Sequence, residues 1–243
     1  MTAWRDLNSS GTEIPYTVSP AVHELLASLG RTEDIRFSPN NRRLAIAAFN
    51  RNTVAVLDID ISRSADASRV ALMRVVEISA TCLKRPHGLD FIDDETLIVA
   101  NREADVAIFR LPPGDIAGLS CQLAPLRVMR ADEARLLKAP GSVSVSSNGQ
   151  RLQEVLICNN SGNYVTRHIL DRSDDCAVSG GEVLLRKWLD IPDSVSVSAD
   201  RRWIAVSNHS THSVLLYENS PRLSPSADPD GMLRGVQIGR AHV

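Results

Sequence analysis

The chain has 243 residues, enough for one large domain or two small ones, and its hydrophobic share of 43% and charged share of 23% are those of an ordinary globular protein. A net charge of −2 gives no electrostatic reason to expect a nucleic acid or an anionic membrane as partner. The N-terminus lacks the apolar core of a secretory signal, and no apolar stretch approaches the ~18 residues of a membrane span, so we expect a cytoplasmic protein.

The N-terminal segment, residues 1–31, precedes the regular part of the chain. Apolar residues recur at helical spacing between positions 20 and 29. This stretch is either a helical turn or the irregular outer strand of the first repeating unit. We therefore assign 1–31 to an N-terminal segment that includes the outer strand of that unit.

A segment of about 54 residues then recurs four times. Each copy opens with Pro or Thr, followed in three of the four copies by a small or acidic residue, and then by an alternating apolar run, a polar turn and a second apolar run that ends in Asn. The copies start at Thr32, Pro86, Pro140 and Pro192. Self-similarity at a period of this length is the mark of a repeat architecture.

The second copy shows its expected strands most clearly. Residues 89–91 alternate between apolar and polar, which predicts a strand with one buried face, and the β-branched run 96–100 predicts a strand buried on both faces. A third strand is expected at 106–111, where Pro112-Pro113-Gly114 ends it, and a fourth at 126–129.

The other copies repeat this order. The corresponding strands are expected at 35–37, 44–47, 54–57 and 70–78 in the first copy, at 143–145, 155–158 and 183–188 in the third, and at 195–197, 203–206, 214–217 and 232–236 in the fourth. Four short antiparallel strands per repeat, with no helices between them, predict an all-β fold: a β-propeller with four recognisable four-stranded blades over residues 32–237.

The copies resemble the YVTN repeat of lactonase-like β-propellers. The resemblance covers about residues 32–220 and rests on the Pro-x-x-apolar-x-apolar opening, the turn at 38–43 and the strands that end in Asn. The namesake tetrapeptide is approximated by Ile98–Asn101, Leu156–Asn159 and Ala205–Asn208. The blades here are longer than that family's usual repeat, and the Trp-Asp and Gly-His dipeptides of WD40 blades are missing. The resemblance implies a ring of six to eight blades.

The last six residues, 238–243, match the translation of a common sequencing adapter. We therefore expect 238–243 to be a non-native tail, and the four blades to be truncated from a six- to eight-bladed ring. Such a fragment would expose an apolar face at each end, so we expect it to self-associate through its exposed blade edges.

Strand topology predicts where a ligand would bind. In a four-strand meander, the start of the innermost strand and the end of the second strand lie at the same edge. This edge forms the mouth of the central channel, and loops on a rigid scaffold are where function concentrates. We predict that a small-molecule or protein ligand contacts His87, Asn101, Arg102 and Asn208 there.

The recurring asparagines allow two interpretations. Their oxygens suit calcium, but Asn also tolerates the left-handed backbone of turns, which a repeated turn would select in every blade. We favour the turn and expect no cofactor or metal, with a divalent cation such as calcium as the alternative. His209 and His212 flank one such turn without an acidic third ligand, which does not favour a metal site.

His87 is the most informative single residue, because it occurs at the start of one repeat only. A histidine can act as a general base near neutral pH, although a solvated histidine beside a turn is the simpler interpretation. Asp34 and Asp193 lie at the starts of two other repeats and are the candidate acids.

Two functions stay open. A binding or scaffold module is favoured, because the sequence contains no nucleophile elbow, phosphate loop or zinc signature. The resemblance implies the alternative, a lactonase-like hydrolase that acts on a sugar lactone with His87, Asp34 and Asp193 as catalytic residues. Fold alone does not decide between them.

Overall fold

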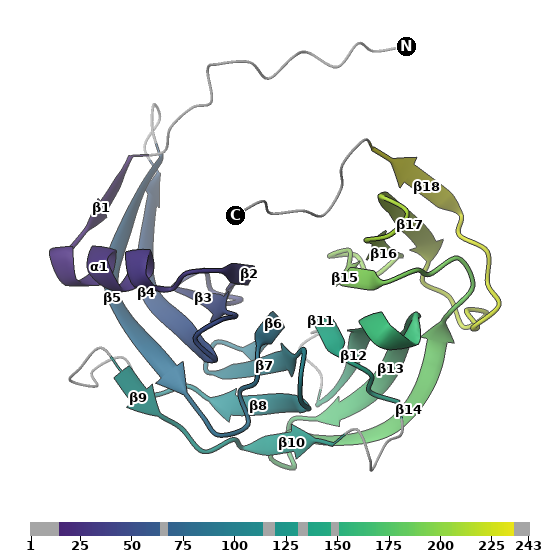
Figure 1. Cartoon of the computed structure of the whole chain (residues 1–243), viewed down its shortest axis with the longest axis horizontal. Coiled ribbons are helices and arrows are strands. Elements are labelled where there is room, and N and C mark those ends of the chain that lie inside the picture. Colours follow the sequence, from purple (N-terminus) through teal and green to yellow (C-terminus); the bar gives the residue numbers. More distant parts are fainter. Residues whose placement is uncertain (1–14, 64–67, 114–119, 131–135, 147–150, 236–243) are drawn as a thin grey trace, which may run out of the picture.

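The computed structural model describes residues 15–63, 68–113, 120–130, 136–146 and 151–235. These residues form four sheets that follow one another along the chain and lie in an arc around a central opening (Figure 1). This is the arrangement of consecutive β-propeller blades. The expected tail, 238–243, lies outside the described residues.

Each sheet runs from an innermost strand beside the opening to an outer strand at the rim, with antiparallel pairing between successive strands. The first sheet holds β2 (Thr32–Phe37), β3 (Arg43–Ala48), β4 (Thr53–Arg63) and β5 (Ser68–Ser79); the second β6 (Pro86–Asp93), β7 (Thr96–Asn101), β8 (Val106–Arg110) and β10 (Arg127–Met129); the third β11 (Pro140–Ser146), β12 (Leu152–Asn159), β13 (Tyr164–Asp171) and β14 (Ala177–Leu185); the fourth β15 (Pro192–Val197), β16 (Trp203–Asn208), β17 (Ser213–Glu218) and β18 (Gly231–Arg234). The prediction of four four-stranded units is confirmed. The innermost strands begin at the four predicted starts.

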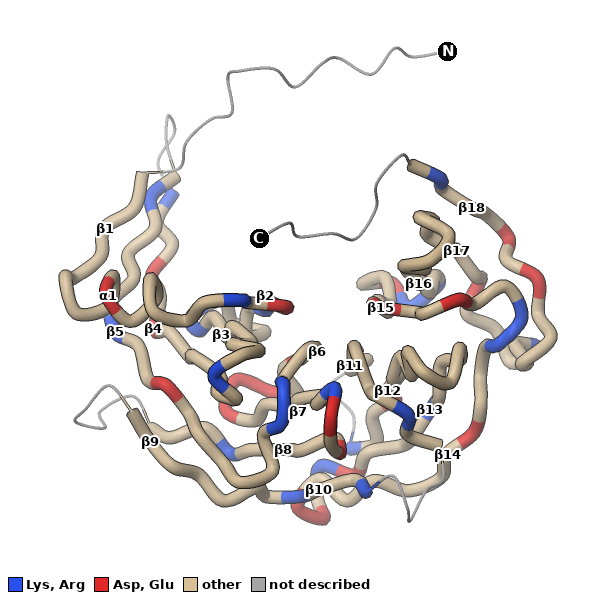
Figure 2. The backbone as a smooth tube through the Cα atoms, viewed as in Figure 1, with Lys and Arg blue, Asp and Glu red and all other residues tan. Residues whose placement is uncertain are grey.

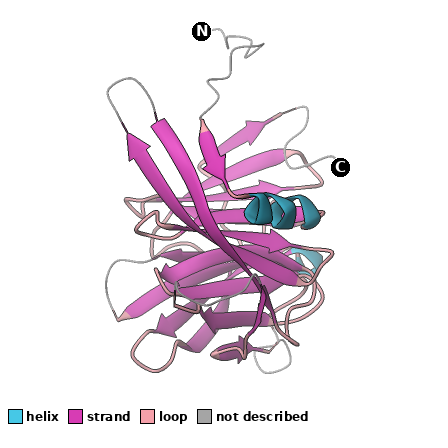
Figure 3. Ribbon diagram, turned by 90° about the vertical axis from the view of Figure 1, so that its left-hand side faces the viewer, coloured by secondary structure: helices cyan, strands magenta, loops and turns pink. Residues whose placement is uncertain are grey.

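The first sheet carries three further elements. Strands β1 (Tyr16–Val18) and β9 (Ser120–Gln122) pair with β5 in parallel. The ambiguous N-terminal stretch is a helix, α1 (Pro20–Ser28), which lies against the first sheet (Figures 1 and 3). Ser19 caps it by accepting a hydrogen bond from the Val22 amide at 3.4 Å. Within the described ranges, no helix is long and apolar enough to cross a membrane.

The core has three apolar layers, one between each pair of neighbouring sheets, and a fourth apolar cluster between α1 and the first sheet. Successive residues of a strand point to opposite faces, so a central strand that is packed on both sides is apolar along its whole length. The layers contain Val54 and Val56 with Leu97 and Val99, then Ile98 and Ile108 with Val155 and Ile157, and then Leu156 and Val165 with Ile204 and Leu215.

The innermost strands share an irregularity that shapes the channel mouth. In all four, the register with the second strand shifts within the first residues, for example between Pro86 and Gly88. Such bulges redirect the side chains around them. The strands also come very close to each other, since a Cβ atom on Gly88 would lie 2.4 Å from Cα of Ser142.

Candidate functional site

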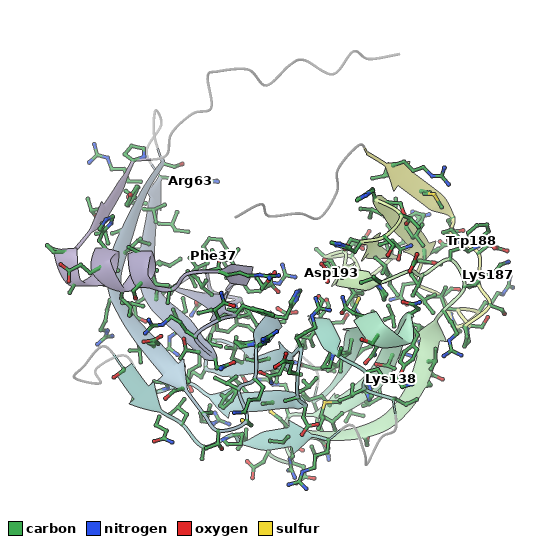
Figure 4. The ribbon with its side chains drawn as sticks, viewed as in Figure 1. Phe37, Arg63, Lys138, Lys187, Trp188 and Asp193 are labelled. Carbon is green, nitrogen blue, oxygen red and sulfur yellow. The ribbon has the colours of Figure 1, made fainter. Side chains whose placement is uncertain are left out.

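Polar side chains from all four sheets meet at the inner ends of the strands. Glu33 on β2, His87 on β6 and Asp193 on β15 come from strand starts, whereas Arg102 follows β7 and Asn160 begins the 3-10 turn after β12. We call these five residues the mouth cluster. Figure 2 shows acidic and basic residues gathered at this inner edge, and Figure 4 shows Asp193 beside the opening.

His87 is buried, with 6% of its surface exposed, and both of its ring nitrogens have partners. Nδ1 lies 2.6 Å from the carbonyl oxygen of Gly141, and Nε2 lies 2.6 Å from Nη2 of Arg102. A carbonyl can only accept a hydrogen bond and a guanidinium can only donate one. His87 therefore carries its proton on Nδ1, and Nε2 accepts.

The surroundings of His87 keep its imidazole neutral. Burial lowers the pKa of His87, the charge of Arg102 lowers it further, and the opposing effects of Asp193 and Glu33 do not outweigh them. The two carboxylates lie 3.9 Å and 3.5 Å from Nε2. The ring also contacts Phe49 edge-on, with 6.0 Å between ring centroids.

Asp193, on the fourth sheet, is joined to the second and third sheets by hydrogen bonds. Its Oδ1 accepts from Nη2 of Arg102 at 2.9 Å and from Nδ2 of Asn160 at 2.7 Å. Burial acts to raise the pKa of Asp193, but the hydrogen bonds from Asn160 and Arg102 and the charge of Arg102 act in the opposite direction, and the pKa is lowered. The carboxylate is therefore ionised and held in place.

Each of three arginines at the mouth is paired with a carboxylate. The pairs are Arg31–Glu33, Arg85–Glu103 (2.9 Å) and Arg102–Asp193 (2.9 Å). The Arg102 guanidinium lies between His87 and Asp193. It supplies the positive charge beside the Asp193 carboxylate that a bound cation would otherwise have to supply. In the part of the chain that the structure describes, no group of three or more His, Cys, Asp or Glu residues is placed to hold a metal ion.

Asp34, one of the predicted acids, has its hydrogen bonds elsewhere. Its Oδ2 accepts from the Leu89 amide at 3.0 Å and its Oδ1 from the Ile35 amide at 2.8 Å. Burial raises the pKa of Asp34. The residue thus links the first innermost strand to the second, and its neighbour Glu33 is the acid beside His87.

Two of the predicted ligand-binding residues, Asn101 and Asn208, are buried and engaged by backbone. Their Oδ1 atoms accept from the amides of Lys84 and Asp190, each at 3.1 Å. Their Nδ2 atoms donate to main-chain carbonyls at 2.8 Å and 2.7 Å. Each side chain therefore fastens the loop that enters its sheet, whereas His87, Arg102 and Asp193 are brought together at the mouth.

Sequence reasoning missed Glu33 and Asn160. Glu33 adjoins the predicted Asp34, and the bulge between Thr32 and Ile35 separates the two side chains in a way that simple alternation does not predict. Asn160 follows the recurring Asn159, in a position that the repeat does not fix. The sequence points to His87 because it is a polar residue that occurs in one repeat only, and the same criterion would have selected Asn160.

No protein-family model matches the chain, and no curated protein matches it. Among solved structures, it is similar to a proposed 6-phosphogluconolactonase from Bacteroides uniformis, with 11% identity, a TM-score of 0.53, and coverage of 84% of this chain and 57% of that one. It is also similar to a chain of a nidogen/laminin complex, with 14% identity, a TM-score of 0.51, and coverage of 86% and 65%. The likeness concerns the fold and is consistent with a lactonase-like β-propeller. The chain spans little more than half the length of the Bacteroides protein.

Proposed function

We propose that this protein is a β-propeller binding module, part of a six- to eight-bladed ring, whose mouth cluster takes up a small, uncharged, hydroxyl-rich molecule. One observation carries the proposal: Arg102 donates to both His87 and Asp193 and so fixes a preformed set of donors and acceptors. A few precisely placed polar groups are what orient a ligand in a binding site.

The balance of charge favours an uncharged ligand. An anionic ligand needs an unmatched cation, but the three arginines at the mouth are paired with carboxylates. A hydroxyl group can donate to a carboxylate such as Glu33 and accept from a guanidinium such as Arg102. Hydroxyl-rich molecules therefore suit this alternation of acid and base.

A hydrolase that acts on a sugar lactone is the second candidate. It is favoured by the position of His87 Nε2, 3.5 Å from Glu33 and 3.9 Å from Asp193. A general base needs a free lone pair, however, and that of Nε2 accepts from Arg102. This function therefore requires Arg102 to move away when the substrate binds.

Saturation-transfer NMR with glucose, galactose, myo-inositol and glucose 6-phosphate tests the binding proposal. We expect at least one uncharged probe to bind the wild type, and Asp193→Asn to weaken it at least about tenfold, which corresponds to ~1.4 kcal/mol. Arg151→Gln is the matched control, because Arg151 is also paired with an aspartate but its side chain is 69% exposed. Failure of every uncharged probe, or equal binding by Asp193→Asn, would contradict the proposal.

Hydrolysis of glucono-1,5-lactone, followed with a pH indicator, tests the second candidate. The binding module predicts no acceleration over the spontaneous reaction. Turnover by the wild type that His87→Gln abolishes, and that Arg151→Gln retains, would replace the binding module with the hydrolase.

A further inference from the structure

Neighbouring sheets pack through the same two sets of positions at each of the three interfaces. Side chains alternate between the two faces of each strand. On the second and third strands of a sheet, we call the side chains that face the following sheet the forward set. Those that face the preceding sheet are the backward set. In the first three sheets the apolar members of the forward sets are buried. They are Ala45, Ala47, Val54 and Val56, then Ile98, Ala100, Val106 and Ile108, and then Leu156, Cys158 and Val165; the fourth member in the third sheet is the half-buried Arg167.

The fourth sheet has a forward set without a described sheet against it. By strand register, its members are Ala205 and Ser207 on β16 with Val214 and Leu216 on β17. All four are only half-buried, whereas their counterparts in the other three sheets are buried except for Arg167, the counterpart of Leu216 in the third sheet.

The first sheet has the complementary gap on its backward face. Ile35 and Phe37 on β2 are 54% and 52% exposed, and Leu44 and Ile46 on β3 are half-buried. Helix α1 packs with residues of β4 and β5 on this face, toward the rim. Figure 4 shows Phe37 on β2, near the opening.

Hydrogen bonds between innermost strands also recur at each of the three interfaces. A side chain on one strand accepts from an amide of the next: Asp34 from Leu89 at 3.0 Å, Asp90 from Val145 at 2.7 Å, and Ser142 from Val195 at 3.3 Å. Ser194 on β15 is the counterpart of Ser142, and it is exposed.

A second hydrogen bond between sheets also recurs. Asn52 and Asn163, each in the left-handed conformation after a second strand, accept from the amides of Arg85 and Ile191 at the start of the following sheet, at 2.7 Å and 3.0 Å. His212 is the counterpart in the fourth sheet and has the same left-handed conformation. Its Nδ1 is buried without a hydrogen-bond partner among the described residues.

We propose that a second copy of this chain fills both gaps: the forward face of the fourth sheet of each copy packs on the backward face of the first sheet of the other. The two faces lie on opposite sides of the opening within one molecule, so they meet only between molecules (Figure 1). The surfaces are unlike, so each contact is heterologous, and two such contacts close a ring of two chains. One copy covers 57% of the Bacteroides protein, so two copies together exceed the length of that chain.

Light scattering on the full chain tests this pairing. We expect the mass of two chains for the wild type, and the mass of one for Leu216→Asp and for Ile35→Asp, which each place a charge on one face. Met73→Asp is the control and should stay dimeric, because Met73 is 62% exposed on β5, outside both faces. Circular dichroism confirms that each variant is folded.

Mixing the two face variants identifies which surfaces pair. Each variant retains one intact face, so an equimolar mixture can form one complete heterologous contact and should regain the mass of two chains. Pairing between like faces would leave Ile35→Asp or Leu216→Asp dimeric alone. The proposal would be overturned if the wild type were monomeric or if either face variant were dimeric. It would also be overturned if the mixture stayed monomeric at a concentration at which the wild type is fully dimeric.

Discussion

A Cβ atom on Gly141 would lie 1.9 Å from Oδ1 of Asn160. The carbonyl oxygen of the same glycine accepts the hydrogen bond from Nδ1 of His87. Gly141 therefore contacts two members of the mouth cluster, one through its backbone and the other because it has no side chain. Its role is to let the third innermost strand approach the turn after β12.

Gly141→Ala is expected to disrupt the mouth cluster. The added methyl group must displace the Asn160 side chain, which breaks its 2.7 Å hydrogen bond to Asp193. Overpacking of this kind costs about 1–3 kcal/mol of unfolding free energy. Urea denaturation measures this loss, and binding of the uncharged probe should weaken in parallel.

Gly231→Ala is the matched control for this substitution. The nearest atom to its added Cβ is 3.7 Å away, an ordinary contact, on the side chain of Leu216. It should change the unfolding free energy much less than Gly141→Ala does. Equal effects of the two substitutions would contradict the close approach of Gly141 to Asn160.

The pKa of His87 should respond in opposite directions to its two charged neighbours. Arg102 lowers this pKa and Asp193 raises it. Arg102→Ala should therefore raise the pKa of His87, and Asp193→Asn should lower it further. Nitrogen-15 NMR of the imidazole measures both shifts, and should show the proton on Nδ1 at neutral pH. A proton on Nε2, or shifts in the same direction, would contradict the network.

Substitution of Asp34 should lower the stability of the fold, whereas substitution of Asp193 should weaken ligand binding. Asp34→Ala removes the acceptor for the Leu89 amide and should lower the unfolding free energy by about 1.5–3 kcal/mol, the range for a hydrogen bond to a charged group. Binding of the uncharged probe should change little. If Asp34→Ala abolished probe binding without loss of stability, Asp34 would belong to the site.

The sequence predicts the framework of this fold because the repeat determines it. The starts at Thr32, Pro86, Pro140 and Pro192 are the first residues of the innermost strands, and meander topology alone brings His87 and Asp193 to one edge. Position within a repeat depends on local pattern, so it can be read without knowledge of distant contacts.

The details of the site depend on contacts that the sequence does not encode locally. The choice between Glu33 and Asp34 depends on a bulge between Thr32 and Ile35. The role of Asn101 depends on the loop that precedes its sheet, because the Lys84 amide reaches its side chain from 17 residues away in the chain. Backbone geometry and loop packing, rather than residue type, separate the structural asparagines from Asn160.

The buried carboxyl of Asp90 should make stability depend on pH. Burial raises the pKa of Asp90 to about 6, although the amides of Val145 and Phe91 donate to it. A pKa above that of the unfolded chain means that the folded state binds the proton more tightly. The Asp90 contribution is therefore complete below about pH 4 and is lost as the pH rises through 6.

Asp90→Asn isolates this effect, because the amide cannot ionise. The unfolding free energy of the wild type minus that of Asp90→Asn should fall between pH 4 and 7 by up to about 3 kcal/mol, at 1.36 kcal/mol per pKa unit. Asp193→Asn provides the opposite sign, since the pKa of Asp193 is lowered and its stabilisation is lost as the pH falls. Denaturation at several pH values measures both differences. A difference for Asp90→Asn that is flat or rises with pH would show that the Asp90 carboxyl is not held protonated by burial between the innermost strands.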